Sequence, residues 1–228
     1  MGFRRKSLKL NKMPLNLTKP LIYLITDGSL ANNLISTHDF KPTLDLIAAS
    51  VSAKISLIQI REKQLSARNL YLLVQQAVSI TNNTETKLLV NDRADIALAA
   101  RADGVHLTTV SLRPPIIRQS FPENFIIGVS THSFSEAQAA RDECADFAVF
   151  GPVFDTNSKR AYGPPVGLEK LREVANALAP FPVLAIGGIS LENAAKTFQS
   201  GASGIASISL LSNALGLAER VNAIRRDF

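Results

Sequence analysis

Residues 55–63 read Ile-Ser-Leu-Ile-Gln-Ile-Arg-Glu-Lys, an apolar run that ends in long polar side chains. Side chains alternate between the two faces of a strand, so this spacing places Gln59, Arg61 and Lys63 on one face. A strand buried in a core tolerates such side chains only where an anion offsets their charge. The alternative is a surface strand with solvated charges, but the preceding residues are too apolar for an exposed edge. The stretch therefore predicts a buried strand that leads to a phosphate-handling site.

The pattern of a short apolar run followed by a longer stretch of helical period recurs about every 20 to 35 residues along the chain. Eight strands are predicted, at 21–25, 55–60, 87–91, 104–107, 125–129, 147–150, 183–186 and 204–208. Helical stretches between them include 66–79, 94–100, 133–141, 168–178, 191–199 and 214–225. Eight βα units favour an α/β fold of the (β/α)₈ barrel type over a doubly wound open sheet. No Gly-x-Gly-x-x-Gly motif follows the first strand, as a dinucleotide-binding sheet would require.

Charge is distributed unevenly along the 228 residues. Residues 1–20 contain no acidic residue and six basic ones, namely Arg4, Arg5, Lys6, Lys9, Lys12 and Lys19. Removing those six from the 25 basic residues leaves as many as the 19 acidic ones, so the net charge of +6 belongs to this tail. A neutral body argues against a nucleic-acid-binding protein. We expect a disordered basic extension over 1–19, rather than a transit peptide, and one barrel domain over 20–228.

The sequence also bears on cellular location. No stretch approaches the roughly 20 apolar residues of a membrane span, and the first residues lack the apolar segment of a secretory signal. Cys144 is the only cysteine, which excludes an internal disulfide and a thiolate metal cluster and suggests a reducing compartment. We therefore expect a cytoplasmic protein that binds neither membranes nor nucleic acid. The sequence leaves assembly into a homo-oligomer open.

The active site of a (β/α)₈ barrel lies at the carboxyl ends of the strands, and polar residues follow most of the predicted strands here. Asp92 follows the third strand, where a carboxylate beside a diphosphate would hold Mg²⁺, although it could instead cap the next helix. Gly187 and Gly188 follow the seventh strand and Ser209 the eighth. Glycines and helix N-termini there predict a phosphate site, although two ordinary tight βα turns would have the same kind of sequence.

The segment after the sixth strand is rich in hydroxyls and amines. Residues 156–160 read Thr-Asn-Ser-Lys-Arg, and such side chains can donate to a diphosphate. Residues 155–165 would then act as a lid over a charged substrate. A flexible surface loop would use similar residues, so this segment alone does not decide.

In order and combination, the motifs at these positions resemble those of the thiamine phosphate synthases and the related thiazole tautomerases. The motifs are Tyr-Leu-Ile-Thr-Asp at 23–27, Gln-Ile-Arg-Glu-Lys at 59–63, Asn-Asp-Arg-Ala-Asp at 91–95, Asp-Gly-Val-His-Leu at 103–107, Gly-Val-Ser-Thr-His at 128–132, Gly-Pro-Val-Phe at 151–154, Ala-Ile-Gly-Gly-Ile at 185–189 and Ser-Ile-Ser at 207–209. The resemblance implies a barrel enzyme of thiamine biosynthesis that couples hydroxymethylpyrimidine diphosphate with thiazole phosphate and releases pyrophosphate. Its partners would be these small phosphorylated precursors.

The resemblance also implies roles for individual residues. The set expected to bind the pyrimidine diphosphate is Gln59, Arg61, Lys63, Asn91, Thr156, Ser158 and Lys159. The set expected to bind the thiazole phosphate is Gly188, Ile208 and Ser209. Asp92 would ligate Mg²⁺, and Ser130 would contact the pyrimidine. The residues expected to act in catalysis are Arg61, Ser130, His132 and Lys159.

One motif departs from the synthase pattern. Synthases usually follow His-Leu with Gly-Gln-x-Asp, whose aspartate is a second Mg²⁺ ligand, whereas 106–111 reads His-Leu-Thr-Thr-Val-Ser here. Ser111 therefore takes the aspartate position, and a neutral hydroxyl is a weak magnesium ligand. Tautomerases also lack that aspartate and need only a proton shuttle, for which His132 is the candidate, unless it simply faces solvent. The sequence thus leaves three functions open: a synthase, a metal-independent tautomerase, and a non-catalytic binder of thiamine precursors.

Overall fold

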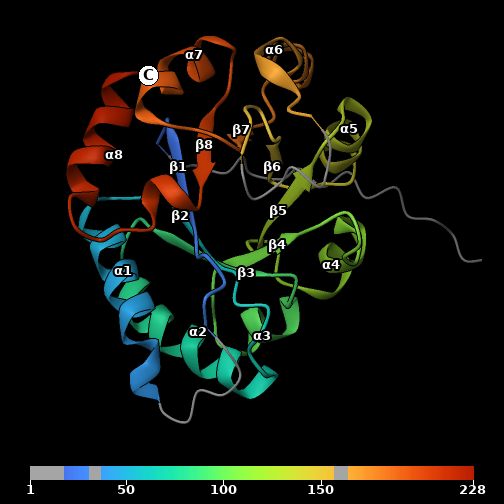
Figure 1. The fold of residues 1–228 in the computed structure, drawn as a ribbon. Helices are drawn as coiled ribbons and strands as arrows, with labels where there is room; N and C mark the ends of the chain where they lie inside the picture. Colours follow the sequence, from blue (N-terminus) through green and yellow to red (C-terminus); the bar gives the residue numbers. More distant parts are fainter. Residues whose placement is uncertain (1–17, 31–36, 157–163) are drawn as a thin grey trace, which may run out of the picture.

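The computed structural model describes residues 18–30, 37–156 and 164–228, and within them eight parallel strands close into a barrel. Each strand pairs with the next along the chain, and the eighth pairs with the first. The strands are β1 (Leu21–Ile25), β2 (Leu57–Ile60), β3 (Lys87–Asn91), β4 (Gly104–Leu107), β5 (Ile126–Thr131), β6 (Phe147–Phe150), β7 (Val183–Ile186) and β8 (Gly204–Ser207). Figure 1 shows the helices arranged around the outside of this barrel. The predicted (β/α)₈ barrel is confirmed, and the doubly wound sheet is wrong.

The described helices cover the outer face of the barrel. They are α1 (Lys41–Ser52), α2 (Ala67–Thr81), α3 (Ala94–Ala99), α4 (Pro114–Ser120), α5 (Phe134–Asp142), α6 (Gly167–Leu178), α7 (Leu191–Gln199) and α8 (Leu217–Arg226). The six predicted helices are present, α7 with the predicted bounds and the other five with shifted ends, whereas α1 and α4 were not predicted. Strand β2 begins two residues later than expected because the N–H of Ile55 donates to the carbonyl of Ser50 at 2.9 Å, within the turn that ends α1. None of the described helices combines the length and the apolar composition needed to cross a bilayer.

Alternation along the strands separates an inner core, which fills the barrel, from an outer core beneath the helices. The inner core contains Leu21, Tyr23, Ile25, Leu57, Leu89, Ile126, Phe147, Val149, Leu184 and Ala206. Positions two residues further along a strand face the same way, so Gln59 and Asn91 enter the barrel above Leu57 and Leu89. The strand register aligns Asn91 with His106. Polar side chains therefore occupy the interior near the carboxyl ends of β2, β3 and β4.

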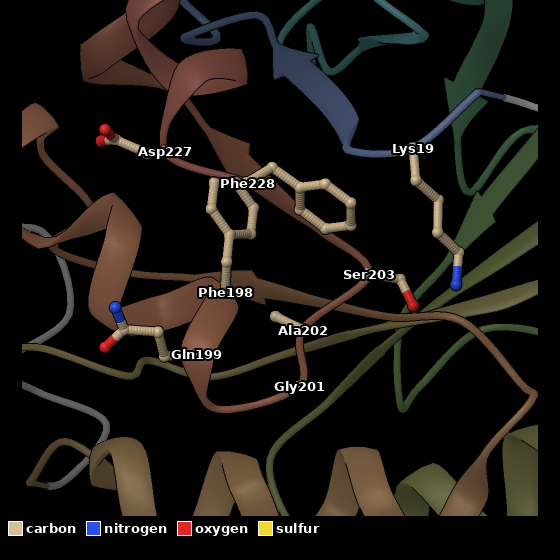
Figure 2. A pocket seen from close by; sticks show the side chains of 8 residues that line it. All are labelled: Lys19, Phe198, Gln199, Gly201, Ala202, Ser203, Asp227 and Phe228. Carbon is tan, nitrogen blue, oxygen red and sulfur yellow. The ribbon is translucent and has the colours of Figure 1, made fainter.

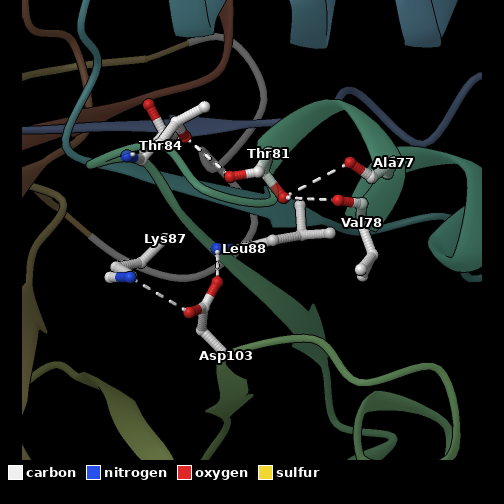
Figure 3. A network of polar contacts seen from close by, with 8 residues as sticks. Ala77, Val78, Thr81, Thr84, Lys87, Leu88 and Asp103 are labelled. Atoms are coloured by element: carbon white, nitrogen blue, oxygen red, sulfur yellow. Dashed lines mark hydrogen bonds and ion pairs between the residues drawn. The ribbon is translucent and has the colours of Figure 1, made fainter.

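Polar contacts at the amino ends of β3 and β4 have a structural role. The Asp103 carboxylate accepts the N–H of Leu88 at 2.8 Å and lies 3.3 Å from the Lys87 ammonium (Figure 3). At the end of α2, the hydroxyl of Thr84 donates to the carbonyl of Thr81 at 2.7 Å. These contacts fix the start of β3, at the end of the barrel that serves stability rather than catalysis.

A buried ion pair ties α4 to the base of β5 and β6. The side chains of Arg118 and Asp146 are 5% and 6% exposed, and their charged groups are in contact. Arg118 Nε also donates to the carbonyl of Cys144 at 2.9 Å, and the Asp146 carboxylate accepts the N–H of Ile127 at 2.7 Å. The pair is well satisfied, so the cost of its burial is offset as long as both partners remain.

Replacing Asp146 with Asn should lower the free energy of unfolding by about 3 kcal/mol, because the guanidinium of Arg118 would stay buried without its counter-charge. Urea denaturation of the two proteins measures the change. Asp45→Asn is the matched control: Asp45 pairs with Lys41 at an exposed position, and its loss should cost less than about 0.5 kcal/mol. Equal effects of the two substitutions would contradict a structural role for the buried pair.

Candidate functional site

A row of four polar side chains, called the buried relay below, crosses the barrel interior near its carboxyl end. Gln59 Nε2 donates to the hydroxyl of Tyr23 at 2.9 Å. That hydroxyl lies 3.2 Å from Nδ1 of His106, and Nε2 of His106 lies 2.9 Å from Oγ of Ser130. Tyr23, Gln59 and His106 are buried, whereas Ser130 is partly exposed at the end of β5. The row thus connects two predicted substrate residues, Gln59 and Ser130, through two residues to which sequence analysis assigned no role.

The two cations of the opening motif lie beyond the strand rather than on it. Strand β2 ends at Ile60, so the prediction that Gln59, Arg61 and Lys63 share one strand face is wrong for the last two residues. The N–H of Arg61 donates to Thr26 Oγ1 at 2.8 Å, which holds the loop after β2 against the loop after β1. Arg61 is partly exposed and Lys63 exposed. Both cations therefore border the mouth of the barrel, while Gln59 lies inside it.

Glu62, between these cations, is a further site residue that sequence analysis did not single out. It is 3% exposed, and its Oε2 accepts the N–H of Leu30 at 3.0 Å. Burial raises the pKa of the Glu62 carboxyl above its ordinary value, and the Thr26 hydroxyl and the Leu30 N–H offset part of that rise. Its other oxygen, Oε1, has no hydrogen-bond partner within the part of the chain that the structure describes. Glu62 joins the loops after β1 and β2, and so fixes the backbone that carries Arg61 and Lys63.

A pocket of about 330 Å³ lies between the loops that follow β2, β3 and β4. Its lining includes Glu62, Lys63, Asn91, Asp92 and Thr108. The structure therefore brings two members of the diphosphate set, Lys63 and Asn91, together with the predicted magnesium ligand. A cation, an amide and a carboxylate around one pocket suit a phosphate group and its counter-ion.

Asp92 does not cap the following helix. The N-cap position of α3 is Arg93, with no side-chain hydrogen bond to the helix. Asp92 itself has a φ of 61°, in the left-handed region that Asp tolerates better than most residues, and its carboxylate is exposed. The alternative explanation for Asp92 is therefore wrong, and its side chain is available to the pocket.

The donors around Asp92 fit a magnesium ion that arrives with a phosphorylated ligand. Mg²⁺ binds through one or two carboxylates, substrate phosphates and several waters. Asp92 supplies one carboxylate, whereas Ser111 Oγ accepts the N–H of Thr108 at 2.8 Å and lies 2.9 Å from Thr108 Oγ1, so it is engaged in its own turn. In the described ranges, no group of three or more His, Cys, Asp or Glu side chains gathers to hold a metal ion. The described residues could thus support such an ion but do not by themselves supply a complete set of ligands.

The glycine pair after β7 packs against the loop after β6. Both glycines have positive φ, and a Cβ on Gly188 would lie 2.5 Å from the carbonyl oxygen of Asp155. The N–H of Phe154 donates to the carbonyl of Gly187 at 3.0 Å. Asp155 therefore contacts Gly188, which belongs to the thiazole phosphate set. The next residue, Thr156, belongs to the diphosphate set, so the two sets are neighbours here. Ser158, Lys159 and most of the predicted lid at 155–165 lie outside the described residues.

The other residues of the thiazole phosphate set lie at the end of β8. Ile208 packs against the inner core, and exposed Ser209 begins the 3₁₀ turn Ser209–Leu211. The N–H of Leu210 donates to Ser207 Oγ at 3.1 Å, which shapes this turn. The neighbouring strand β7 leads to Gly188 and then to the N-terminus of α7. This is the arrangement in which (β/α)₈ barrels bind phosphate.

His132 is held in one orientation at the end of β5. Its Nδ1 lies 2.6 Å from the carbonyl oxygen of Gly151, and since a carbonyl only accepts, Nδ1 carries the hydrogen. Its backbone N–H donates to Glu136 at 2.6 Å. In the neutral form of this exposed ring, Nε2 is then the acceptor that a proton shuttle requires.

A second pocket, of about 280 Å³, lies at the opposite end of the barrel (Figure 2). Its lining includes Lys19, Ser203 and the rings of Phe198 and Phe228, which meet edge to face with centroids 5.2 Å apart. Lys19 precedes β1 and Ser203 precedes β8, so this pocket faces away from the carboxyl ends of the strands. It takes no part in the site described above.

A (β/α)₈ barrel with cations, glycine turns and a buried polar row at the carboxyl ends of its strands defines a class of protein that binds phosphorylated small molecules. The family model described as thiamine monophosphate synthase matches residues 22–211, and the chain belongs to this family.

Individual relatives agree with the family match. A thiamine-phosphate synthase of Roseiflexus sp. is 38% identical over 189 residues, which cover 83% of this chain and 77% of the relative. That of Moorella thermoacetica is 38% identical over 186 residues, covering 82% and 87%. Among solved structures, a thiamine phosphate pyrophosphorylase from Pyrococcus furiosus superposes with a TM-score of 0.75 at 30% identity, over 90% of this chain and 94% of that one.

Replacing Glu62 with Gln should alter how stability depends on pH. The folded state holds the Glu62 proton more tightly than the unfolded state does, so wild-type stability is lost as the pH rises above the ordinary glutamate pKa. The Gln variant lacks this loss and can still accept the N–H of Leu30. The free energy of unfolding of wild type minus that of the variant should therefore fall as the pH rises above the ordinary glutamate pKa, as measured by urea denaturation.

The matched control is Glu123→Gln, which removes a carboxylate from an exposed position. A wild-type minus Glu62→Gln difference that stayed constant with pH would contradict the raised pKa.

Proposed function

We propose that this chain is a thiamine phosphate synthase, which couples hydroxymethylpyrimidine diphosphate with thiazole phosphate to form thiamine phosphate and pyrophosphate. The observation that carries the proposal is the pairing of Arg61 and Lys63 at the barrel mouth with a buried polar row directly inside it. Relatives at 38% identity that are named thiamine-phosphate synthases support it.

The chemistry sets two requirements for the site. The bond between the pyrimidine methylene carbon and the diphosphate breaks, which leaves a cationic carbon, and the thiazole nitrogen then bonds to that carbon. The departing diphosphate needs positive charge, and the cationic pyrimidine needs a dry pocket that excludes water as a competing nucleophile. Arg61, Lys63 and the proposed donor Lys159 meet the first requirement, and the buried relay meets the second.

Asp92 and Asn91 form the side of the pocket proposed for the metal and the diphosphate. When bound there, Mg²⁺ would offset the negative charge that develops on the departing diphosphate. Asp92 would hold the ion, and Lys63 would bind phosphate oxygens next to it. In this proposal the diphosphate itself supplies ligands that the protein lacks.

The thiazole phosphate is proposed to bind at the neighbouring strand ends, on Gly188, Ile208 and Ser209. Gly188 lies next to Asp155 and hence to Thr156, so the two phosphate sites share a border. Such a border brings the thiazole nitrogen toward the pyrimidine carbon, and this proximity alone lowers the barrier to coupling.

The first experiment is a coupling assay with purified protein, Mg²⁺, hydroxymethylpyrimidine diphosphate and thiazole carboxylate phosphate, in which thiamine phosphate and the isomers of the thiazole carboxylate are separated by chromatography. We expect metal-dependent formation of thiamine phosphate. Its absence, with the protein folded and both precursors intact, would overturn the proposal.

A second candidate, a thiazole tautomerase, is favoured by one observation: the fixed orientation of His132, with Nε2 left as an acceptor. In the coupling assay without pyrimidine diphosphate, interconversion of thiazole isomers that survives a chelator would identify this activity. A loss of that interconversion in His132→Asn would assign the proton shuttle. Binding of the precursors without any turnover would leave the third possibility, a non-catalytic binder.

Replacing Ser111 with Asp should lower the Mg²⁺ concentration for half-maximal coupling by about tenfold, because a second carboxylate would face the pocket beside Asp92. One oxygen of the introduced carboxylate would replace the hydroxyl that accepts the N–H of Thr108, and the other would be free for the ion. Ser111→Asn, which preserves the turn without adding charge, is the matched control. An equal response of the two variants would contradict a position near the metal.

A further inference from the structure

The hydrogens in the buried relay can be placed from donor and acceptor chemistry alone. The amide Nε2 of Gln59 only donates, so the oxygen of Tyr23 is the acceptor in their 2.9 Å contact. Burial raises the pKa of the Tyr23 hydroxyl above its ordinary value, so the hydroxyl keeps its hydrogen. That hydrogen needs an acceptor, because an unpaired buried donor is costly. The acceptor within reach is Nδ1 of His106, at 3.2 Å.

This placement determines the tautomer of His106. A neutral imidazole that accepts at Nδ1 carries its hydrogen on Nε2. Nε2 lies 2.9 Å from Oγ of Ser130, so His106 donates and Ser130 accepts. The hydroxyl hydrogen of Ser130 is then directed away from His106, toward the partly exposed end of β5. Each step of the relay thus follows from the one before it.

Packing holds the imidazole ring in this orientation. The rings of Tyr23 and Phe147 lie 5.6 Å and 6.0 Å from that of His106, measured between centroids. A Cβ on Gly128 would lie 2.7 Å from Nδ1 of His106 and 2.4 Å from Cζ of Phe147. Only glycine leaves room for the ring there, so the ring cannot turn without displacing the inner core.

We propose that Tyr23 and His106 are positioning residues that make Ser130 a hydrogen-bond donor to the substrate, and thereby select a 4-aminopyrimidine over a 4-oxopyrimidine. This inference rests on the proposed function. In a 4-aminopyrimidine, the ring nitrogen beside the amino group is an acceptor and suits the Ser130 hydroxyl. In the 4-oxo form that nitrogen carries a hydrogen. Ser130 could accept it only with its remaining lone pair, and the hydroxyl hydrogen would then be left without the acceptor that the 4-amino form provides.

The first test measures the tautomers directly and needs no activity. In the wild-type protein labelled with ¹⁵N-histidine, long-range ¹H–¹⁵N spectra at neutral pH should show a neutral ring with its hydrogen on Nε2 for His106. His132 should show the opposite tautomer, with its hydrogen on Nδ1. Spectra of His106→Gln and His132→Asn assign the two signals. A hydrogen on Nδ1 of His106, alone or together with one on Nε2, would overturn the relay.

The second test measures selectivity, as kcat/KM for hydroxymethylpyrimidine diphosphate divided by that for its 4-oxo analogue. Tyr23→Phe should lower this ratio about tenfold or more, because Nδ1 of His106 would lose its donor and the ring could adopt the other tautomer. A merely structural loss would lower both kcat/KM values equally and leave the ratio unchanged, which would overturn the proposal. Tyr71→Phe, on α2 and outside the relay, is the matched control.

A pair of substitutions at His106 separates the donor from the bulk of the ring. The amide nitrogen of His106→Gln can occupy the place of Nε2 and donate to Ser130, whereas the shorter side chain of His106→Asn cannot reach it. The Gln variant should therefore keep a higher selectivity ratio than the Asn variant, and equal ratios would overturn the role of this donor. A wild-type protein that forms thiamine phosphate but shows no preference would overturn the inference alone. One that couples neither substrate would overturn the proposed function, and the selectivity with it.

Discussion

The interior of a closed barrel imposes the constraint on which the rest of this structure depends. Each inward side chain must pack against its neighbours, and each polar one must find a partner, because little water reaches the interior. Apolar residues meet this condition in the lower part of the barrel. Near the carboxyl ends, where the substrate site is proposed, Gln59, Tyr23, His106 and Ser130 meet it by bonding to one another. The same contacts that make this end stable also fix the directions in which its hydrogens point.

The loops beyond the strands are held by contacts between loops rather than by side chains packed in a core. Glu62 bonds to Leu30 across the loops after β2 and β1, and Phe154 bonds to Gly187 across those after β6 and β7. Such contacts fix the backbone while leaving cationic side chains free to reach a ligand. Burying the Glu62 carboxylate lowers the stability of the fold relative to an apolar residue, as its raised pKa indicates. This destabilising group lies next to the place where phosphate groups are proposed to bind.

Sequence alone could predict the barrel because its strands are short apolar runs at regular intervals, and five of the eight have the predicted bounds. Helix α1 was missed because its N-cap, Phe40, has no capping side chain, and α4 because it is short and opens with two prolines. The strand-end positions of Asp92, Gly188 and Ser209 were predictable from the order of the units. The relay was not, since Tyr23 and His106 are 83 positions apart and meet only when the barrel closes. The role of Glu62 could not be predicted for the same reason, because its partner Leu30 lies 32 positions away in the sequence.

Ser111 affects how the negative charge of a diphosphate would be offset in the proposed site, by a metal ion or by cationic side chains. Its hydroxyl is engaged with Thr108, so it adds no second carboxylate beside Asp92. The other carboxyl group of the pocket lining, that of Glu62, has a raised pKa. Fewer carboxylates weaken the hold on a metal ion, but they also leave more net positive charge around a diphosphate. In the proposed reaction, Arg61 and Lys63 would then face fewer negative protein groups and would act more strongly on the departing diphosphate. In the proposed function, such a site would depend less on a tightly held ion and more on its own cations, so a serine in place of the second aspartate is compatible with coupling.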